Sequence, residues 1–280
     1  MADKKNIKPK YVLSPLNNKM LNYSVYYMSF KQKIFFTCLA FIIGGLVGLV
    51  FYGGLFKSEG EDTTATLISN IAVFCIVGLI AIKASTKSIK DKLKSNRDKK
   101  IERQFMDLLE NLSTALSAGN TVNSAFVNAK TEMANQYSEK DLIIQELSEI
   151  LLGLENGKTL EEMLLSFGKR SGNEDIENFS NVMSNCYRLG GDFKKIVSRT
   201  RNIISDKIAV SSEIETKLAS NKLQFQFMCF MPIALVAMLK LTNGSFQSNL
   251  ASPIGVVVTT IAIAIFVISY FWGNKIINIR

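Results

Sequence analysis

The sequence predicts an all-α membrane protein with four transmembrane helices, arranged two plus two, and a six-helix cytoplasmic bundle between the second and third spans. The first observation is that apolar residues cluster into four uncharged runs, each close to the roughly 20 residues that a helix needs to cross a bilayer. The second is the helical spacing of apolar residues in the polar segment between the two pairs of runs. We therefore place the spans at residues 34–56, 63–82, 223–241 and 253–272.

The distribution of charge predicts the orientation of the chain. The net charge is +9, and residues 1–33 alone hold seven lysines against one aspartate. Because lysine and arginine concentrate on the cytoplasmic side of membrane proteins, the tail 1–33, the segment 83–222 and the end 273–280 are all expected inside. The same distribution excludes a nucleic-acid-binding role, since the basic excess lies beside the membrane. The first span follows a long polar tail and precedes no small-x-small cleavage site, so we expect it to remain as a signal anchor.

Two basic segments each leave two interpretations open. Either the second half of the tail lies along the membrane surface through its aromatic residues and lysines, or the tail is a disordered basic topology signal. The juxtamembrane neck, residues 83–100, either anchors the orientation or contacts anionic lipid or an acidic partner. The candidate lipid-facing residues of the neck are Lys90, Lys92, Lys94, Arg97, Lys99 and Lys100.

Apolar stripes at helical spacing run through residues 101–222, and glycine-centred turns separate them. Each turn places a glycine where a helix end favours positive φ, with a threonine or aspartate two residues later that can cap the next helix. We predict three helical hairpins, with helices starting near 101, 121, 138, 159, 174 and 192. The last helix has no breaker before Pro232, so it is expected to run from the domain into the third span. The predicted turn residues are Gly119, Gly157, Gly190 and Gly191.

Two short patterns concern helix packing and helix starts. Gly44 and Gly48 lie four residues apart in the first span and form a small-residue face that allows close helix packing. Ser252 and Pro253 have the types preferred at the N-cap and first position of a helix, and they precede the fourth span.

Patterns that would indicate catalysis or cofactor binding are weak. The sequence from Gly153 to Thr159 is one residue short of a phosphate-binding P-loop and follows a predicted helix instead of a strand. The chain has no histidine, its four cysteines have no metal-ligand spacing, and no ionisable residue lies near the middle of a span. We therefore expect no enzymatic activity, no cofactor and no metal.

The order of several short motifs resembles the type II secretion F domain family, and within it the tight-adherence (Tad) or Flp-type pilus platform proteins. The matching stretch runs from about Phe105 to the C-terminus. It includes Leu109–Phe126, the turn Gly157–Glu162, the segment Arg170–Asp175 and Leu189–Phe193 before a long basic helix. One such domain with four spans is similar to the Tad branch, whereas the tail is longer than that branch usually has.

The resemblance implies a platform in the bacterial inner membrane, with both termini in the cytoplasm. It implies that the platform couples a hexameric cytoplasmic secretion ATPase to pilin extraction and assembly. The implied partners are that ATPase, pilin subunits, and a second related platform protein or another copy of this chain; anionic lipid is a further candidate partner. The alternative is a proton-driven stator or energiser subunit with the same two-plus-two topology.

The geometry of alternating hairpins, combined with this resemblance, suggests where the ATPase docks. If the sixth helix leads into the third span, its first residues lie far from the membrane. The glycine-centred turns at the same end of the bundle are then also far from the membrane. The candidate docking residues at these turns are Asn120, Lys158, Glu161, Glu162, Arg188 and Asp192.

Overall fold

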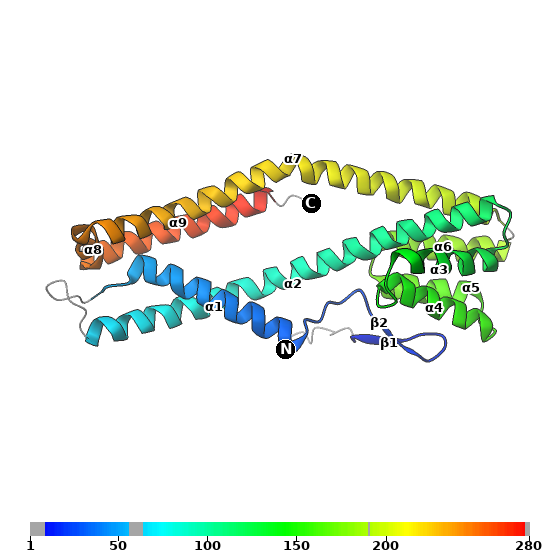
Figure 1. Cartoon of the computed structure of the whole chain (residues 1–280), viewed down its shortest axis with the longest axis horizontal. Coiled ribbons are helices and arrows are strands. Elements are labelled where there is room, and N and C mark those ends of the chain that lie inside the picture. The colour runs from blue at the N-terminus through cyan, green and yellow to red at the C-terminus, as the bar shows by residue number, and fades with distance from the viewer. Residues whose placement is uncertain (1–8, 56–63, 190, 278–280) are drawn as a thin grey trace, which may run out of the picture. The chain divides into compact units, whose positions relative to one another are not determined.

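The computed structural model describes residues 9–55, 64–189 and 191–277, and its chain divides into two compact units (Figure 1). The first unit comprises Met1–Tyr27 and Lys90–Ser211, and the second comprises Met28–Ile89 and Ser212–Arg280. Helices α2 (Thr64–Ser117) and α7 (Phe193–Thr242) each contribute residues to both units.

The described residues include four helices that are long and apolar enough to cross a membrane. They are Phe30–Tyr52, which is α1, then Thr64–Ser117, Phe193–Thr242 and Pro253–Ile276. At most 11% of the residues in their most apolar windows are buried within the protein. Apolar side chains that face outward along a whole helix are expected where lipid surrounds it. These helices lie at the four runs that the sequence predicts.

Helix α1 packs against α2 through a face of glycines. Gly44, Gly45 and Gly48 are the buried residues that the structure describes in α1. A Cβ atom added at Gly44 would overlap the side chain of Ala81, and one added at Gly48 would lie 3.0 Å from the Cβ of Val77. The predicted small-residue face therefore lies at a helix contact. Helix α1 ends at Tyr52, four residues before the predicted end of the span, because Gly53 is extended and Gly54 has φ +86°.

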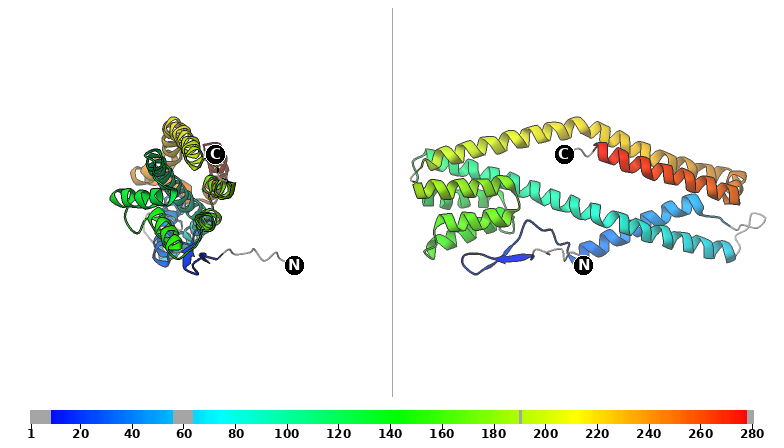
Figure 2. Two further views of the ribbon diagram at one scale, coloured as in Figure 1. Left: turned by 90° about the vertical axis from the view of Figure 1, so that its right-hand side faces the viewer. Right: turned by 180° about the vertical axis from the view of Figure 1, so that it is seen from behind.

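The carboxy-terminal part of the second unit contains α8 (Gly244–Ala251) and α9 (Pro253–Ile277). Helix α9 lies beside the end of α7, as Figures 1 and 2 both show, and the ring of Tyr270 stacks on that of Phe225. Ser252 accepts a hydrogen bond from the backbone N–H of Gly255, so it caps α9 as its sequence predicts. Helix α7 continues past Pro232 and ends at Thr242.

The neck and the first helix of the domain form one helix with the second span. Helix α2 runs through 54 residues, so the predicted boundaries at 82 and 100 do not interrupt it. The domain also contains four short helices: α3 (Val122–Gln136), α4 (Leu142–Glu155), α5 (Leu160–Ser171) and α6 (Glu174–Leu189). Their starts lie within one residue of the predicted positions except in α4. That helix starts four residues late because Asp141 folds back to accept the N–H of Ser138.

The turns of the domain have the predicted chemistry where the structure describes them. Gly119 has φ +85° and Gly157 has φ +76°. Thr121 accepts the N–H of Ser124, Thr159 accepts that of Glu162, and Asp192 accepts that of Lys195. A glycine that ends one helix thus precedes a side chain that starts the next.

The core of the first unit joins α2 to α7. It contains buried side chains from all six helical segments of the described unit, among them Leu112, Phe126, Leu147, Phe167, Ile176 and Val197. The rings of Phe105 and Phe179 meet edge to face at 5.3 Å between centroids. Burial of these apolar stripes against one another holds the short helices together.

The amino-terminal tail differs most from the expectation. Strands β1 (Tyr11–Leu13) and β2 (Lys19–Leu21) form an antiparallel hairpin in which Val12 pairs with Met20. The hairpin belongs to the first unit, and the Tyr23 side chain that follows it is only 1% exposed. Over residues 9–27 the tail is an ordered part of the first unit, so the interpretation as a disordered topology signal is wrong for this stretch. Residues 1–8 lie outside the described residues.

We expect Leu112→Ala to destabilise the first unit by about 2–5 kcal/mol, because Leu112 is fully buried and its loss leaves a cavity. The measurement is urea-dependent pulse proteolysis of the detergent-purified chain, following fragments of the helical domain. The matched control is Leu152→Ala on α4, where the side chain is 43% exposed and the change should be small. Equal effects of the two substitutions would contradict the described core.

Candidate functional site

A buried ion pair between α4 and α5 lies at the centre of the polar contacts in the first unit. The guanidinium of Arg170 donates to both carboxylate oxygens of Glu146, with each N–O distance 2.7 Å. The two side chains are 5% and 1% exposed. Burial alone would lower the pKa of Arg170, but the hydrogen bonds to Glu146 raise it above its usual value. A paired, two-point geometry of this kind offsets the cost of removing two charges from water.

Tyr23 joins the amino-terminal hairpin to this ion pair. Its hydroxyl donates to Glu146 Oε1 at 2.8 Å, and its backbone N–H donates to the carbonyl of Arg170 at 2.8 Å. Burial, and then the negative charge of Glu146, raise the pKa of Tyr23 well above its ordinary value. The phenol therefore remains a hydrogen-bond donor throughout the physiological pH range.

A second carboxylate on α4 holds the turn of the hairpin. Ser14 Oγ donates to Glu149 Oε1 at 2.6 Å, and the side-chain amide of Asn18 donates to both oxygens of Glu149 at 3.1 and 3.2 Å. Glu146 and Glu149 are three residues apart and so share one face of α4. That face of α4 makes most of the polar contacts that hold the hairpin in place, and we call it the seat of the hairpin.

The seat continues onto α5 and α2. Gly172 at the end of α5 has φ +64°, and an added Cβ would lie 2.6 Å from the Cα of Ser24. From α2, the guanidinium of Arg97 donates to the carbonyls of Tyr23 and Val25. Arg97 also lies 5.1 Å from the ring centroid of Tyr26, within cation–π range.

The structure separates the six neck residues that the sequence groups together. Arg97 contacts the segment that follows the hairpin, and Lys100 forms an ion pair with Asp141 at the start of α4. The hydrogen bond from Lys100 lowers the pKa of Asp141. Both residues therefore have partners inside the first unit. The side chain of Lys94 is half-buried, whereas those of Lys90, Lys92 and Lys99 are exposed.

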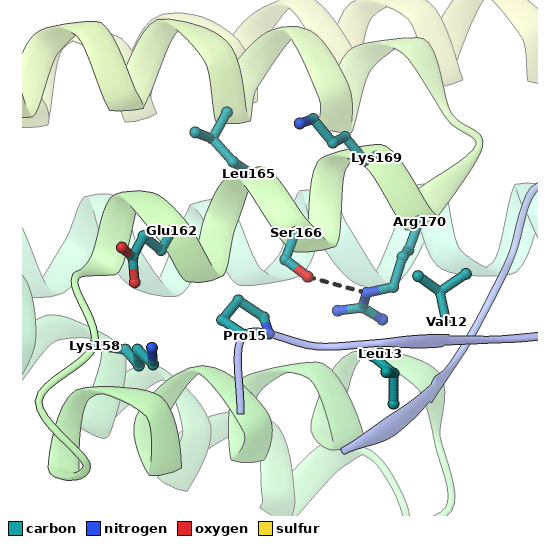
Figure 3. Close-up of a pocket in the computed structure, with 9 residues that line it drawn as sticks. All are labelled: Val12, Leu13, Pro15, Lys158, Glu162, Leu165, Ser166, Lys169 and Arg170. Carbon is teal, nitrogen blue, oxygen red and sulfur yellow. Dashed lines mark hydrogen bonds between the residues drawn. The ribbon is translucent and has the colours of Figure 1, made fainter. Parts of the chain in front are cut away.

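An open groove of about 420 Å³ lies between the hairpin and α5 (Figure 3). The hairpin contributes Val12, Leu13 and Pro15 to its lining. Residues of α5 and of the turn before it form the other side: Lys158, Glu162, Leu165, Ser166, Lys169 and Arg170. Ser166 Oγ accepts a hydrogen bond from Nε of Arg170, which ties the groove to the buried ion pair.

The candidate docking residues are distributed over several places. Lys158 and Glu162 line the groove, and Glu161 is half-buried beside them in the first turn of α5. Asn120 donates its side-chain amide to the carbonyl of Ala115, and Asp192 is the exposed cap of α7. The side chain of Arg188 and the whole of Gly190 lie outside the described residues. The backbone N–H of Gly191 donates to the carbonyl of Cys186.

The hairpin and its seat are not among the features predicted from the sequence, although two signals for the hairpin are present. Tyr11-Val-Leu is a short run of strand-forming residues, and the following Pro15-Leu-Asn-Asn is rich in turn formers. Asn17 has φ +61° in that turn. The contacts of Glu146 and Glu149 with the amino-terminal segment leave no local signal, because Tyr23, Ser14 and Asn18 lie more than 120 residues away.

We expect Arg170→Leu to destabilise the first unit by about 3–5 kcal/mol, because it leaves Glu146 as a buried charge without its counter-ion. The double variant Glu146→Leu/Arg170→Leu should be milder, since neither charge is then stranded. Pulse proteolysis of the full chain measures both, with exposed Lys169→Leu as the matched control. A double variant as unstable as the single one would contradict a stranded charge as the cause of the destabilisation.

Comparison with known proteins finds similarity over the helical domain. Residues 108–241 match the family model of the Type II secretion system (T2SS), protein F. The match begins in α2, includes α3 to α6 and ends in α7. Neither the curated proteins nor the solved structures gave a match to the chain. The matched stretch supports the type II secretion F family and a secretion or pilus-assembly platform protein.

Proposed function

We propose that the chain is an inner-membrane platform of a Tad/Flp-like type IV pilus or of a type II secretion-like machine. In this function it couples a cytoplasmic secretion ATPase to the extraction and assembly of pilin subunits. The observation that carries the proposal is the match of residues 108–241 to protein F of the type II secretion system. The matched stretch covers most of the helical domain and the third candidate span. In the proposed function the domain binds partners in the cytoplasm and the span holds it in the membrane.

The apolar helices support a multi-pass position in the inner membrane. Four of the described helices are long and apolar enough to span it. Helix α1 precedes the helical domain and α9 follows it, whereas α2 and α7 each run between a candidate span and the domain. We propose the two-plus-two arrangement with both termini in the cytoplasm, because the basic tail and neck favour that side. The residues between the first and second spans, and those between the third and fourth, are then the external parts of the chain.

The continuity of α2 and α7 supports a mechanical role. Each helix contains residues of the domain core and residues of a candidate span without an intervening loop. A displacement of the domain would therefore be passed to these spans along hydrogen-bonded helix. The proposed chemistry is confined to the ATPase, and the platform contributes only binding and movement.

We expect the full chain to co-purify with the secretion ATPase of its own cell and with small pilins. The measurement is affinity purification of the tagged chain in mild detergent, followed by mass spectrometry. A chain of the same membrane topology that lacks the matched domain is the control for non-specific capture. Recovery of a single-span partner with an intramembrane aspartate, and of no ATPase, would favour the stator alternative.

We expect Ser248 to lie outside the membrane and Glu139 inside. In a chain without native cysteines, Ser248→Cys should react with an impermeant maleimide in spheroplasts, whereas Glu139→Cys should react only after permeabilisation. Both positions are exposed, so burial does not limit the reaction. Native Cys186 is buried and is a poor reporter. The opposite labelling pattern would overturn the proposed orientation.

A further inference from the structure

The groove between the hairpin and α5 is open to solvent and has apolar residues in its lining. Leu13 on β1 is 60% exposed, and Val12, Pro15 and Leu165 lie beside it in the groove lining. Figure 3 shows Val12 and Pro15 of the hairpin on the side of Ser166 and Arg170 of α5. Apolar side chains that gather in a concave place bordered by charge are typical of an interaction site.

The charged lining residues favour an acidic occupant. Lys158 and Lys169 are exposed at the groove, whereas the charge of Arg170 is already balanced by its ion pair with Glu146. Among the described lining residues, Glu162 carries the negative charge. The two lysines therefore leave the groove with a net positive charge. Complementary charge selects and orients a partner, while apolar contact supplies most of the affinity.

We propose that this groove is the docking site for a short segment of the cytoplasmic ATPase that carries carboxylates beside an apolar side chain. The carboxylates lie against Lys158 and Lys169, and the apolar side chain rests on Leu13 and Leu165. This inference depends on the proposed function and adds the place and chemistry of the contact.

The amino-terminal hairpin is part of this docking site because it forms one of its walls. A two-stranded hairpin is marginally stable by itself, so its position depends on the contacts of Tyr23, Ser14 and Asn18 with α4. These contacts fix the groove before a partner arrives, which lowers the entropic cost of binding. Without the hairpin, Lys158 and Lys169 would lose Val12, Leu13 and Pro15 as apolar neighbours in the groove lining.

Site-specific photo-crosslinking in cells that contain the full chain and its ATPase tests the proposal. A photoreactive phenylalanine derivative replaces Leu13 or Leu165 in the groove, or Val127 on α3 as the control. Val127 is 51% exposed and is not among the groove-lining residues. We expect ATPase adducts from both groove positions and at most background from Val127. Co-purification of the ATPase is measured in the same samples.

Two sets of variants separate the roles of charge and of the hairpin. Lys169→Glu should lower the Leu165 adduct about tenfold, and Lys140→Glu, an exposed change away from the groove, should leave it unchanged. Ser14→Ala/Asn18→Ala should also lower the Leu165 adduct, although α5 itself is unaltered. Leu13→Asp changes a side chain that is 60% exposed, and it should also lower the Leu165 adduct, so it tests the hairpin wall if the double variant misfolds.

The outcomes distinguish failure of the groove from failure of the function. If the ATPase co-purifies but neither groove position yields an adduct with it, the docking site is wrong and the platform function stands. Adducts only with lipid or with other proteins would overturn the docking site equally. If no ATPase is recovered with the unaltered chain, both the proposed function and the docking site fail.

Discussion

The paired carboxylate and guanidinium of Glu146 and Arg170 constrain the helical domain more than its other polar contacts do. They lie in the interior, where an isolated charge is costly, so α4 and α5 must stay together with both hydrogen bonds intact. The hydroxyl of Tyr23 donates a hydrogen bond to an oxygen of the same carboxylate. The seat of the hairpin is therefore built from a contact that the domain already needs for its own folding.

This arrangement explains why a segment before the first span belongs to a domain that follows the second. The hairpin has too few residues to form a core of its own. It gains stability by supplying hydroxyl and amide donors to two carboxylates that α4 presents on one face. The polar side chains specify where the hairpin lies, and the buried ring of Tyr23 adds apolar contact.

The sequence predicts the helices well because their signals are local. Four uncharged runs, apolar residues at helical spacing, and glycines such as Gly119 and Gly157 each act within one or two turns of chain. The hairpin seat could not be predicted in this way, since Ser14 and Glu149 are 135 residues apart. The docking residues fall between these cases: the glycine-centred turns predict Lys158 and Glu162, but the groove that these residues line also needs a wall from a distant segment. Fold type follows from periodicity, whereas a site made by two remote segments requires their contact to be known.

Because α2 is one continuous helix, the number of residues between its span and its domain sets the angle about the helix axis between the faces that pack in each. An α-helix turns by about 100° and rises about 1.5 Å per residue. Inserting one residue near Lys90 would therefore turn the face that carries Phe105 and Leu112 by about 100° relative to the face that meets Gly44 and Gly48. Inserting seven residues would restore the faces to within about 20°, at the expense of some 10 Å of added length. The number of residues in the neck therefore sets the angle between these two packing faces of one continuous helix.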